Sequence, residues 1–515
     1  MKNLKRIFSA VLTLVLAFCM ISAVSAAATK GSITVKNATV GKKYEIYKIF
    51  DLTHSGTKVA YTIDSDWSAF FESTTGSKYI IDLEKDQDGN VVNPNGLNAI
   101  TVNGAVKYIN ITDKNISTFA QEALTYATSL AGNDGEKTAT TKTEGVTKVD
   151  LVFDNLDLGY YLVYPEGASD KLDANGSICS LDSTLKDVEV TIKAKYPEIT
   201  KTVEDDTLDV GNNAKFTVTG QVPDTTGFST YTYKITDTMS TGLSFDATIS
   251  NFKLTIDGTE IKIDENENVT LTYDNNGFVL TFEMTKFQDK VGKQIVVTYE
   301  AKVTEAAINN NAVKNKAFLE YSNDPKNNKT MDKTPNIEIP VYTSAIKVLK
   351  VDGADKTTPL AGAEFVLTKE VNGVTKYYQA KNANNEIITN VSTTTGVVTV
   401  NWVSRENATV LVTDANGNIT FGGIENGTYN LVETKAPEGF NLLTKPEEVK
   451  VGYNEEGTNI QKVSVIKEAT VENNAGTEIP STGGMGTTLF VVIGSLLAIA
   501  SAVIFVTNKR IAKEM

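Results

Sequence analysis

The chain has 515 residues, with 49 basic and 63 acidic side chains, two cysteines and one histidine. At about 150 residues per domain, this length predicts about three domains. The formal net charge of −14 argues against nucleic-acid binding, because phosphates are held by clustered Lys and Arg. So few His and Cys residues leave no zinc site, no Ser-His-Asp triad and no disulfide framework. We therefore expect a protein without a metal ion, a cofactor or a conventional active site.

Residues 1–26 are typical of a secretory signal peptide. Basic residues between Lys2 and Arg6 precede an apolar run, and Val24-Ser25-Ala26 is a small-residue cleavage site. The alternative, a permanent transmembrane helix, is disfavoured because small residues end the run. The chain is therefore expected to be exported.

Short runs rich in Val, Thr, Ile and Tyr, separated by Asn, Asp and Gly, fill the centre of the chain. Their alternation predicts a mainly β protein made of antiparallel sandwiches. Prolines and changes of strand register predict boundaries at Tyr196-Pro197 and between Pro335 and Pro340. The three predicted domains are 29–196, 197–338 and 339–476.

The first predicted domain also contains helical periodicity. Apolar residues from Ile116 to Leu130 fall on one helical face, and residues 67–72 predict a second, shorter helix. Outside the signal peptide the chain has a single cysteine, Cys179, so no disulfide within the chain is expected. A long exported β protein without disulfides needs another source of resistance to shear and proteases.

The third predicted domain contains three motifs. They are Ile346-Lys-Val-Leu-Lys350-Val-Asp352, a Tyr-x-Leu-x-Glu-Thr-x-Ala-Pro-x-Gly box from Tyr429 to Gly439, and Val471-Glu-Asn473. This segment resembles a collagen-adhesin B-type domain, and the chain as a whole resembles the backbone pilins of Gram-positive bacteria. The resemblance implies tandem immunoglobulin-like or collagen-adhesin-type sandwiches that form spontaneous isopeptide bonds between Lys and Asn.

In the third domain the resemblance assigns Lys350 as the amine, Asn473 as the acceptor amide and Glu433 as the proton shuttle. Burial drives a lysine towards its neutral form and a carboxyl towards its protonated form. The protonated acid then polarises the amide and relays protons until ammonia leaves. Fixed neighbours supply the effective concentration, so no cofactor is needed.

Strand alternation favours Lys350 over Lys347 as the amine. Ile346, Val348 and Lys350 share one face of the strand, and an apolar core face would carry Lys350 inward. Asn474 is the alternative acceptor if the register slips by one residue. Solvated strand residues without chemistry are the simpler alternative.

The second domain contains Ile199-Thr-Lys201-Thr-Val203, a central segment with Asp237, and a late strand beginning at Asn315. It is similar to the isopeptide-forming middle domain of fimbrial subunits, which implies Lys201 as amine, Asn315 as acceptor and Asp237 as catalytic acid. The alternative is that Asp237 only caps a turn before Gly242.

The first domain departs from this pattern, because Tyr164 stands where the shuttle acid is expected. We therefore predict no isopeptide bond in the first domain. This domain is expected to rely on packing alone.

Ile479-Pro480-Ser481-Thr482-Gly483 precedes an uncharged stretch, 487–507, that is long enough to cross a bilayer. A basic tail, 508–515, follows, which holds this end in the cytoplasm. The arrangement resembles an LPXTG-type sorting signal, with Ile in place of Leu in the motif at 479–483. It implies that a sortase cuts between Thr482 and Gly483 and holds Thr482 as a thioester until an amine attacks. An ordinary single-pass anchor is the alternative.

Polymerisation needs a lysine that attacks the thioester of another subunit. The family places it after a Tyr-Pro pair, but Glu198 occupies that position here. We predict Lys195, and secondarily Lys193, as the linking residue. Ordinary exposed lysines are the alternative, and Lys201 is excluded if its amine is consumed internally.

These features predict the shaft subunit of a sortase-assembled pilus on the cell wall of a Gram-positive bacterium, with a precursor in the plasma membrane and a role in adhesion. The implied partners are a pilus sortase, a housekeeping sortase, other pilin subunits, peptidoglycan and an unidentified host surface ligand. The chain itself is expected not to be an enzyme. The alternatives are a non-polymerised or tip adhesin anchored to the wall and, more remotely, a surface hydrolase.

Overall fold

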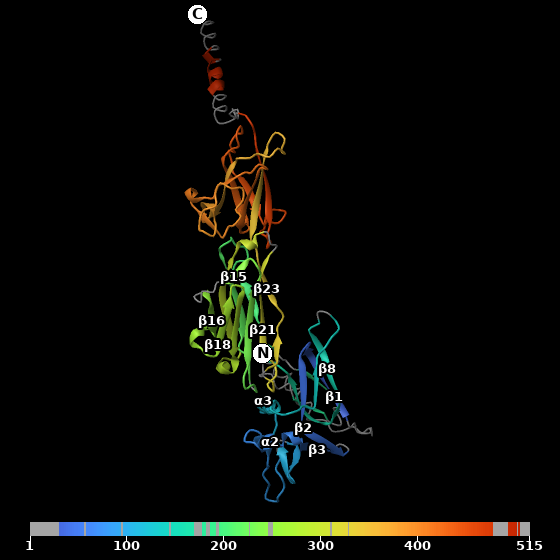
Figure 1. Cartoon of the computed structure of the whole chain (residues 1–515). Coiled ribbons are helices and arrows are strands. Elements are labelled where there is room, and N and C mark those ends of the chain that lie inside the picture. Colours follow the sequence, from blue (N-terminus) through green and yellow to red (C-terminus); the bar gives the residue numbers. More distant parts are fainter. Residues whose placement is uncertain are drawn as a thin grey trace. The chain divides into compact units, whose positions relative to one another are not determined.

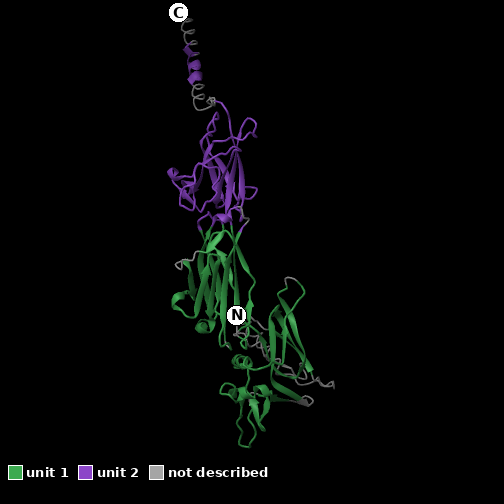
Figure 2. Cartoon of the chain, in the orientation of Figure 1, with its two compact units in different colours: residues 1–206, 213–303, 313–341 green, residues 207–212, 304–312, 342–515 purple. Residues whose placement is uncertain are grey.

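The structure, a computed structural model, describes residues 30–504 apart from 56–57, 94–95, 144–145, 169–177, 182–185, 192–194, 226, 246–250, 309–311, 328, 477–492 and 502. Strands dominate this part of the chain and form six sheets, which confirms the predicted mainly β fold (Figure 1). Two compact units are present (Figure 2). The first comprises 1–206, 213–303 and 313–341, and the second comprises 207–212, 304–312 and 342–515.

The sheets occur as three successive pairs along the chain, which we call the first, middle and third sandwiches. The first sandwich occupies residues 30–191 and the middle sandwich occupies 200–341 apart from 207–212 and 304–312, both in the first unit. The third sandwich occupies residues 344–473, in the second unit. The exact boundaries of the three predicted domains remain predictions.

The first sandwich combines a sheet of order β11-β1-β8 with a larger sheet of order β10-β9-β2-β3-β5-β6-β4, in which β7 also pairs with β2. Both predicted helices are present, and α3 buries Phe119, Ala120, Ala123 and Ala127 on one face, as its periodicity predicts. The elements are β1 (Lys30–Thr39), β2 (Lys43–Ser55), β3 (Lys58–Ile63), η1 (Ser65–Trp67), α2 (Ser68–Glu72), η2 (Ser77–Tyr79), β4 (Ile80–Ile81), β5 (Ala99–Val102), β6 (Ala105–Ile109), α3 (Ile116–Ala127), β7 (Gly135–Thr138), β8 (Lys148–Asp157), β9 (Gly159–Pro165), β10 (Ile178–Leu181) and β11 (Asp187–Thr191).

The middle sandwich faces a sheet of order β12-β13-β20-β16-β17, with β15 on β20, against a sheet of order β18-β19-β14-β21-β22, with β23 on β21. Buried and less buried residues alternate along β13, β14, β20 and β21, so every second side chain enters the core. The elements are β12 (Thr200–Val203), β13 (Asn213–Gln221), β14 (Thr232–Met239), β15 (Leu243–Phe245), β16 (Lys253–Ile256), β17 (Thr259–Glu260), η5 (Ile263–Glu265), β18 (Val269–Asp274), β19 (Gly277–Glu283), η6 (Met284–Lys290), β20 (Gln294–Val303), β21 (Val313–Ser322), β22 (Met331–Lys333) and β23 (Ile337–Val341). A short helix between β20 and β21, η7 (Glu305–Ala307), belongs to the second unit.

The third sandwich pairs a sheet of order β29-β24-β32 with a sheet of order β27-β26-β25-β30-β31, in which β28 also pairs with β25. Strand β24 runs parallel to β32 and antiparallel to β29. The elements are β24 (Ser344–Asp352), β25 (Glu364–Val371), β26 (Val374–Lys381), β27 (Thr399–Val403), η8 (Arg405–Asn407), β28 (Leu411–Val412), β29 (Asn418–Ile424), β30 (Gly427–Lys435), β31 (Glu447–Val451) and β32 (Ile466–Asn473).

Residues 207–212 belong to the second unit, although they lie far in sequence from its main part, 342–515. Both backbone groups of Val210 form hydrogen bonds with the second unit. The Val210 amide donates to the Gly423 carbonyl, and the Val210 carbonyl accepts from the Val400 amide. The buried carboxylate of Asp209 accepts hydrogen bonds from Trp402 Nε1 at 2.8 Å and from the Glu425 amide at 2.9 Å. Burial raises the pKa of Asp209 to about 6. These contacts integrate the segment into the core of the second unit.

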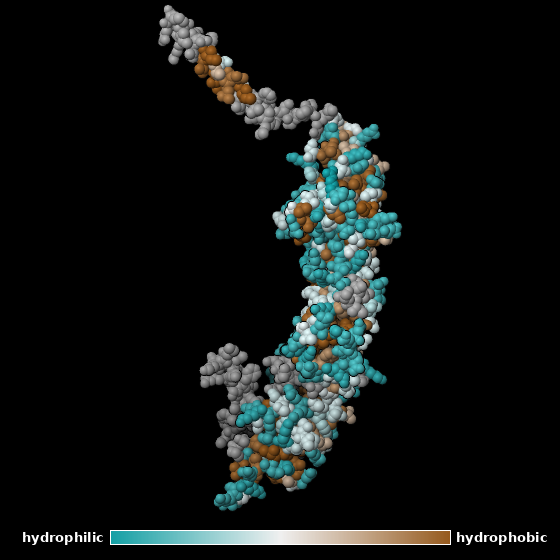
Figure 3. Space-filling model, turned by 90° about the vertical axis from the view of Figure 1, so that its left-hand side faces the viewer, coloured by the Kyte–Doolittle hydropathy of each residue, from teal (hydrophilic) through white to brown (hydrophobic). Residues whose placement is uncertain are grey.

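The ends of the chain are described only in part. The predicted signal peptide (1–26), sorting motif (479–483) and basic tail (508–515) lie outside the described residues. The described part of the predicted span is a helix with exposed apolar side chains (Figure 3), which include those of Ile493, Leu496, Leu497, Ile499, Val503 and Ile504. No helix in the described part of the chain combines the length and apolar character of a membrane span.

Charged hydrogen bonds connect the first and middle sandwiches within the first unit. Lys42 Nζ donates to Tyr321 OH at 2.7 Å and to Asp332 Oδ2 at 2.5 Å. Lys326 Nζ donates to Tyr47 OH at 2.7 Å. Because Lys42 and Asp332 are both largely shielded from water, these bonds are screened less than surface ion pairs.

We expect Lys42→Met to destabilise the first unit by about 1–3 kcal/mol, because it leaves a half-buried carboxylate without its cation. Urea unfolding of the full chain, followed by circular dichroism, measures this effect. Lys30→Met is the matched control, since Lys30 pairs with Asp157 in solvent and the loss should stay below about 1 kcal/mol. Equal losses in the two variants would contradict the prediction.

Candidate crosslinking sites

The middle sandwich brings the three predicted residues Lys201, Asp237 and Asn315 together. Lys201 lies on β12 in one sheet, while Asp237 on β14 and Asn315 on β21 lie in the facing sheet. Their alternating positions direct all three side chains into the core, where their exposed fractions are 5%, 2% and 0%. Asp237 lies within a strand, not in the turn that contains Gly242.

A fourth residue, Tyr299 on β20, completes this cluster. Lys201 Nζ donates to a carboxylate oxygen of Asp237 and to Tyr299 OH, the latter at 2.7 Å. Asn315 Nδ2 donates to the same hydroxyl at 3.0 Å. Tyr299 was not predicted from the sequence. Its only signal is a hydroxyl at an inward position of a strand whose other inward residues, Ile295, Val297, Ala301 and Val303, are apolar.

Burial favours the neutral forms of both Lys201 and Asp237. It lowers the pKa of Lys201 to about 8 and raises the pKa of Asp237, although their mutual attraction opposes both shifts. Asp237 Oδ1 and Asn315 Oδ1 are buried acceptors without a hydrogen-bond partner among the described residues. A proton on the carboxyl of Asp237 would supply the hydrogen-bond donor that these two acceptor oxygens lack.

The third sandwich brings together Lys350, Glu433 and Asn473. Strands β24 and β32 are parallel neighbours, with Lys350 opposite Val471, so Asn473 follows two residues further on the same face. Glu433 reaches the site from β30 in the facing sheet. The exposed fractions are 0% for Lys350, 5% for Glu433 and 1% for Asn473.

The carboxylate of Glu433 lies at the centre of this second site. Asn473 Nδ2 donates to its two oxygens at 2.9 and 3.0 Å, and the Leu443 amide donates to Oε2 at 2.8 Å. Lys350 Nζ lies 4.0 Å from Glu433 Oε1 and donates to the Val471 carbonyl at 3.1 Å. Burial lowers the pKa of Lys350 to about 8. The neutral amine is therefore accessible close to neutral pH.

The alternative residues of the third site lie elsewhere. Lys347 is exposed and lies 3.8 Å from Glu468, and Asn474 is also exposed. In the first sandwich, Tyr164 is buried on β9 opposite Glu45 of β2. The absence of a bond in that sandwich remains a prediction.

The residues predicted to join subunits are only partly described. Lys195 is exposed in the segment before β12, whereas Lys193, Thr482 and Gly483 lie outside the described residues. Lys195 therefore remains a prediction from sequence.

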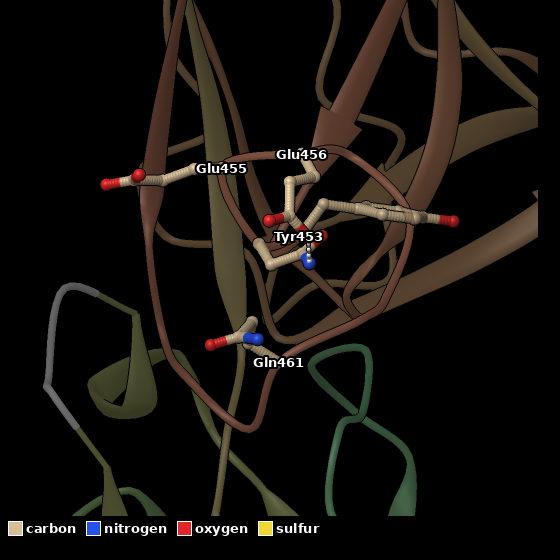
Figure 4. Close-up of a pocket in the computed structure, with 5 residues that line it drawn as sticks. Tyr453, Glu455, Glu456 and Gln461 are labelled. Atoms are coloured by element: carbon tan, nitrogen blue, oxygen red, sulfur yellow. Dashed lines mark hydrogen bonds between the residues drawn. The ribbon is translucent and has the colours of Figure 1, made fainter.

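Other features of the described residues lie apart from the two Lys-acid-Asn clusters. Among them, no group of three or more His, Cys, Asp or Glu could hold a metal ion. An open hollow of about 380 Å³ in the loop after β31 is lined by Tyr453, Asn454, Glu455, Glu456 and Gln461. Figure 4 shows the Glu455 carboxylate directed away from the other side chains. The residues of the two Lys-acid-Asn sites do not line it.

Known proteins and family models are similar in sequence to parts of this chain. Residues 344–467 match the SpaA family model, a prealbumin-like fold domain, and residues 471–513 match the LPXTG cell wall anchor motif. The trypsin-resistant surface T6 protein of Streptococcus pyogenes serotype M6 is 27% identical over 388 residues, which cover 62% of this chain and 70% of that protein. The type 1 fimbrial subunit of Actinomyces viscosus is 37% identical over 82 residues, or 16% of this chain and 15% of that protein.

The predicted resemblance to Gram-positive pilins is confirmed. The anchor match includes the predicted sorting motif and indicates attachment to the cell wall. Among solved structures, the T6 backbone pilin of Streptococcus pyogenes serotype M6 aligns with a TM-score of 0.45 and 19% identity, covering 82% of this chain and 81% of that one.

We expect the stability of an unbonded third sandwich to rise with pH between about 8 and 10.5, because Lys350 has a lowered pKa in the folded state. In this window the unfolded chain binds more protons than the folded one, so loss of protons favours folding. Urea unfolding of Asn473→Ala across this range measures the slope. Adding Lys350→Met should flatten it, and an unchanged slope would contradict the assignment to Lys350.

Proposed function

We propose that the chain is the shaft subunit of a covalently polymerised, sortase-assembled surface pilus, in which the middle and third sandwiches each form a Lys-Asn isopeptide bond. One observation carries this proposal. Two separate cores each bury an amine, a carboxyl group and a carboxamide within reach of one another. Burial of such a set is costly unless the groups are paired or used chemically.

The proposed bond is a balanced acyl transfer. The neutral lysine Nζ attacks the Cγ atom of the asparagine, and a new C–N bond forms as the bond to Nδ2 breaks. The acid polarises the amide oxygen and carries one proton from Nζ to Nδ2, which leaves as ammonia. The acid ends in its starting state, so the reaction needs no external reagent. The chain would thus act once on itself and would not be an enzyme.

The positions of the two pairs suit a protein under tension. Each lysine lies on the first strand of its sandwich, β12 or β24, and each asparagine lies on a late strand, β21 or β32. A bond between them would let force pass from one strand to the other without separating the two strands. A disulfide would serve the same purpose, but Cys179 is the only cysteine outside the signal region.

Assembly would proceed through the anchor motif. A pilus sortase would cleave after Thr482 and transfer its carbonyl to Lys195 of the next subunit, and a housekeeping sortase would finally transfer the polymer to peptidoglycan. Contact with a host surface ligand would follow from display on the wall. The second candidate, a wall-anchored or tip adhesin, is favoured by Glu198 at the position where the family carries its linking lysine.

We expect the intact mass of the purified exported chain to fall short of the value calculated from its sequence by two ammonia molecules. Asp237→Ala and Glu433→Ala should each restore one of them, because each removes one proton shuttle. Intact-protein mass spectrometry measures the deficit, and tryptic mapping locates each bond.

Lys347→Ala and Asn474→Ala are matched controls, since these exposed residues neighbour the reacting pair in sequence. Both should keep the full deficit. A wild-type chain of the calculated mass would disprove both proposed bonds.

We expect co-expression with a pilus sortase to produce a ladder of multimers that survive boiling in detergent. Lys195→Arg should abolish the ladder, because a guanidinium is always charged and is a poor nucleophile. Lys186→Arg, which changes another exposed lysine, is the control and should leave the ladder intact.

A ladder that persists in Lys195→Arg would exclude Lys195 as the linking residue. If the wild type gave a single wall-bound species in the presence of its sortase, the anchored adhesin would replace the shaft subunit as the best account.

A further inference from the structure

The hydroxyl of Tyr299 contacts each of the three reacting residues in the middle sandwich. It donates to Asp237 Oδ2 at 2.5 Å and accepts from Lys201 Nζ at 2.7 Å and from Asn315 Nδ2 at 3.0 Å. A hydroxyl has one donor and two acceptor positions, so these three contacts use its full capacity. The attacking nitrogen and the leaving nitrogen are therefore held by the same oxygen atom.

The ring of Tyr299 is fixed by aromatic neighbours. It stacks on Phe216 with ring centroids 5.6 Å apart, and it meets Phe278 edge-on at 4.9 Å. Tyr299 is only 2% exposed, and burial raises its pKa well above the ordinary value. The phenol therefore stays protonated and keeps its orientation while the nitrogen atoms react around it.

We propose that Tyr299 is a fourth catalytic residue of the middle sandwich, which holds the attacking nitrogen of Lys201 and relays the proton from Asp237 to the leaving nitrogen of Asn315 during isopeptide formation. This inference rests on the proposed function, since it assigns a role in that bond. The family resemblance implied only a lysine, an acid and an asparagine.

The relay uses both oxygens of a protonated Asp237. As Nζ attacks, Asp237 Oδ1 gives its proton to Asn315 Oδ1, while Nζ passes a proton to Asp237 Oδ2, which it contacts directly. As the intermediate collapses, Oδ1 recovers its proton from the amide oxygen. Asp237 Oδ2 then returns a proton through Tyr299 to Nδ2, which leaves as ammonia. Asp237 and Tyr299 both end unchanged.

Two features of the site support this route. Asp237 Oδ1 and Asn315 Oδ1 are the unpartnered buried atoms between which the first proton moves. The third site has a different arrangement, because Asn473 Nδ2 donates directly to Glu433 and a backbone amide of Leu443 orients that acid. There the leaving nitrogen already touches the acid, so no intermediary is needed.

The test compares the rates of the two bonds within one molecule. The full exported chain is synthesised in vitro, quenched at intervals in acid and denaturant, and analysed by mass spectrometry of its tryptic peptides. We expect Tyr299→Phe to slow the Lys201-Asn315 bond by about 100-fold or more, which is the usual contribution of proton transfer. The Lys350-Asn473 bond should form at the wild-type rate.

Tyr233→Phe is the matched control. Tyr233 is buried on the same strand as Asp237, but its hydroxyl lies next to Gly220 and has no hydrogen-bond partner among the described residues. It should leave both bonds unaffected. Circular dichroism and trypsin resistance report whether each variant folds.

A second variant tests the proton relay apart from folding. Incorporation of 3-fluorotyrosine at position 299 lowers the phenol pKa with little change in shape, and it should change the pH dependence of the Lys201-Asn315 bond alone. Wild-type rates in Tyr299→Phe, or an unchanged pH profile with the fluorinated residue, would overturn the role of Tyr299. Absence of both bonds from the wild type would instead refute the proposed function.

Discussion

The burial of a lysine amine between two β-sheets is the constraint on which the proposed chemistry of this chain depends. Moving an ammonium into a core costs several kcal/mol unless a partner compensates. In both sites the lysine meets a carboxyl group within the core, and its pKa falls to about 8. In the proposed reaction, the burial that disfavours the charged ammonium also favours the neutral amine, which is the nucleophile. Facing sheets then hold the acid and the amide within reach.

The two sites bury their lysine, acid and asparagine through different strand arrangements. In the middle sandwich the lysine approaches from the sheet opposite the asparagine, and Tyr299 connects the groups. In the third sandwich the lysine and asparagine lie on parallel neighbours, and the acid spans the gap from the facing sheet. Burial of a lysine, an acid and an asparagine in one core therefore does not depend on a single strand topology.

Much of this arrangement was predictable from sequence, because alternation determines which side chains enter a core. It separated Lys350 from Lys347, and the motif box singled out Glu433. The periodicity of Ile116–Ala127 gave a correct helix. Tyr299 was not predicted, since an inward tyrosine is an ordinary core residue until its neighbours in space are known. The place of Asp209 in the second unit also had no local signal, because its partners, Trp402 and Glu425, are about two hundred positions away.

The segments 207–212 and 304–312 have a consequence for how such proteins diversify. Both belong to the second unit, although each is flanked in sequence by strands of the first. A recombination event that replaced only residues from 342 onward would exchange Trp402 and Glu425 but leave Asp209 in place. These contacts would then survive only if the incoming C-terminal module carried compatible partners for Asp209, or if the segment 207–212 moved with it.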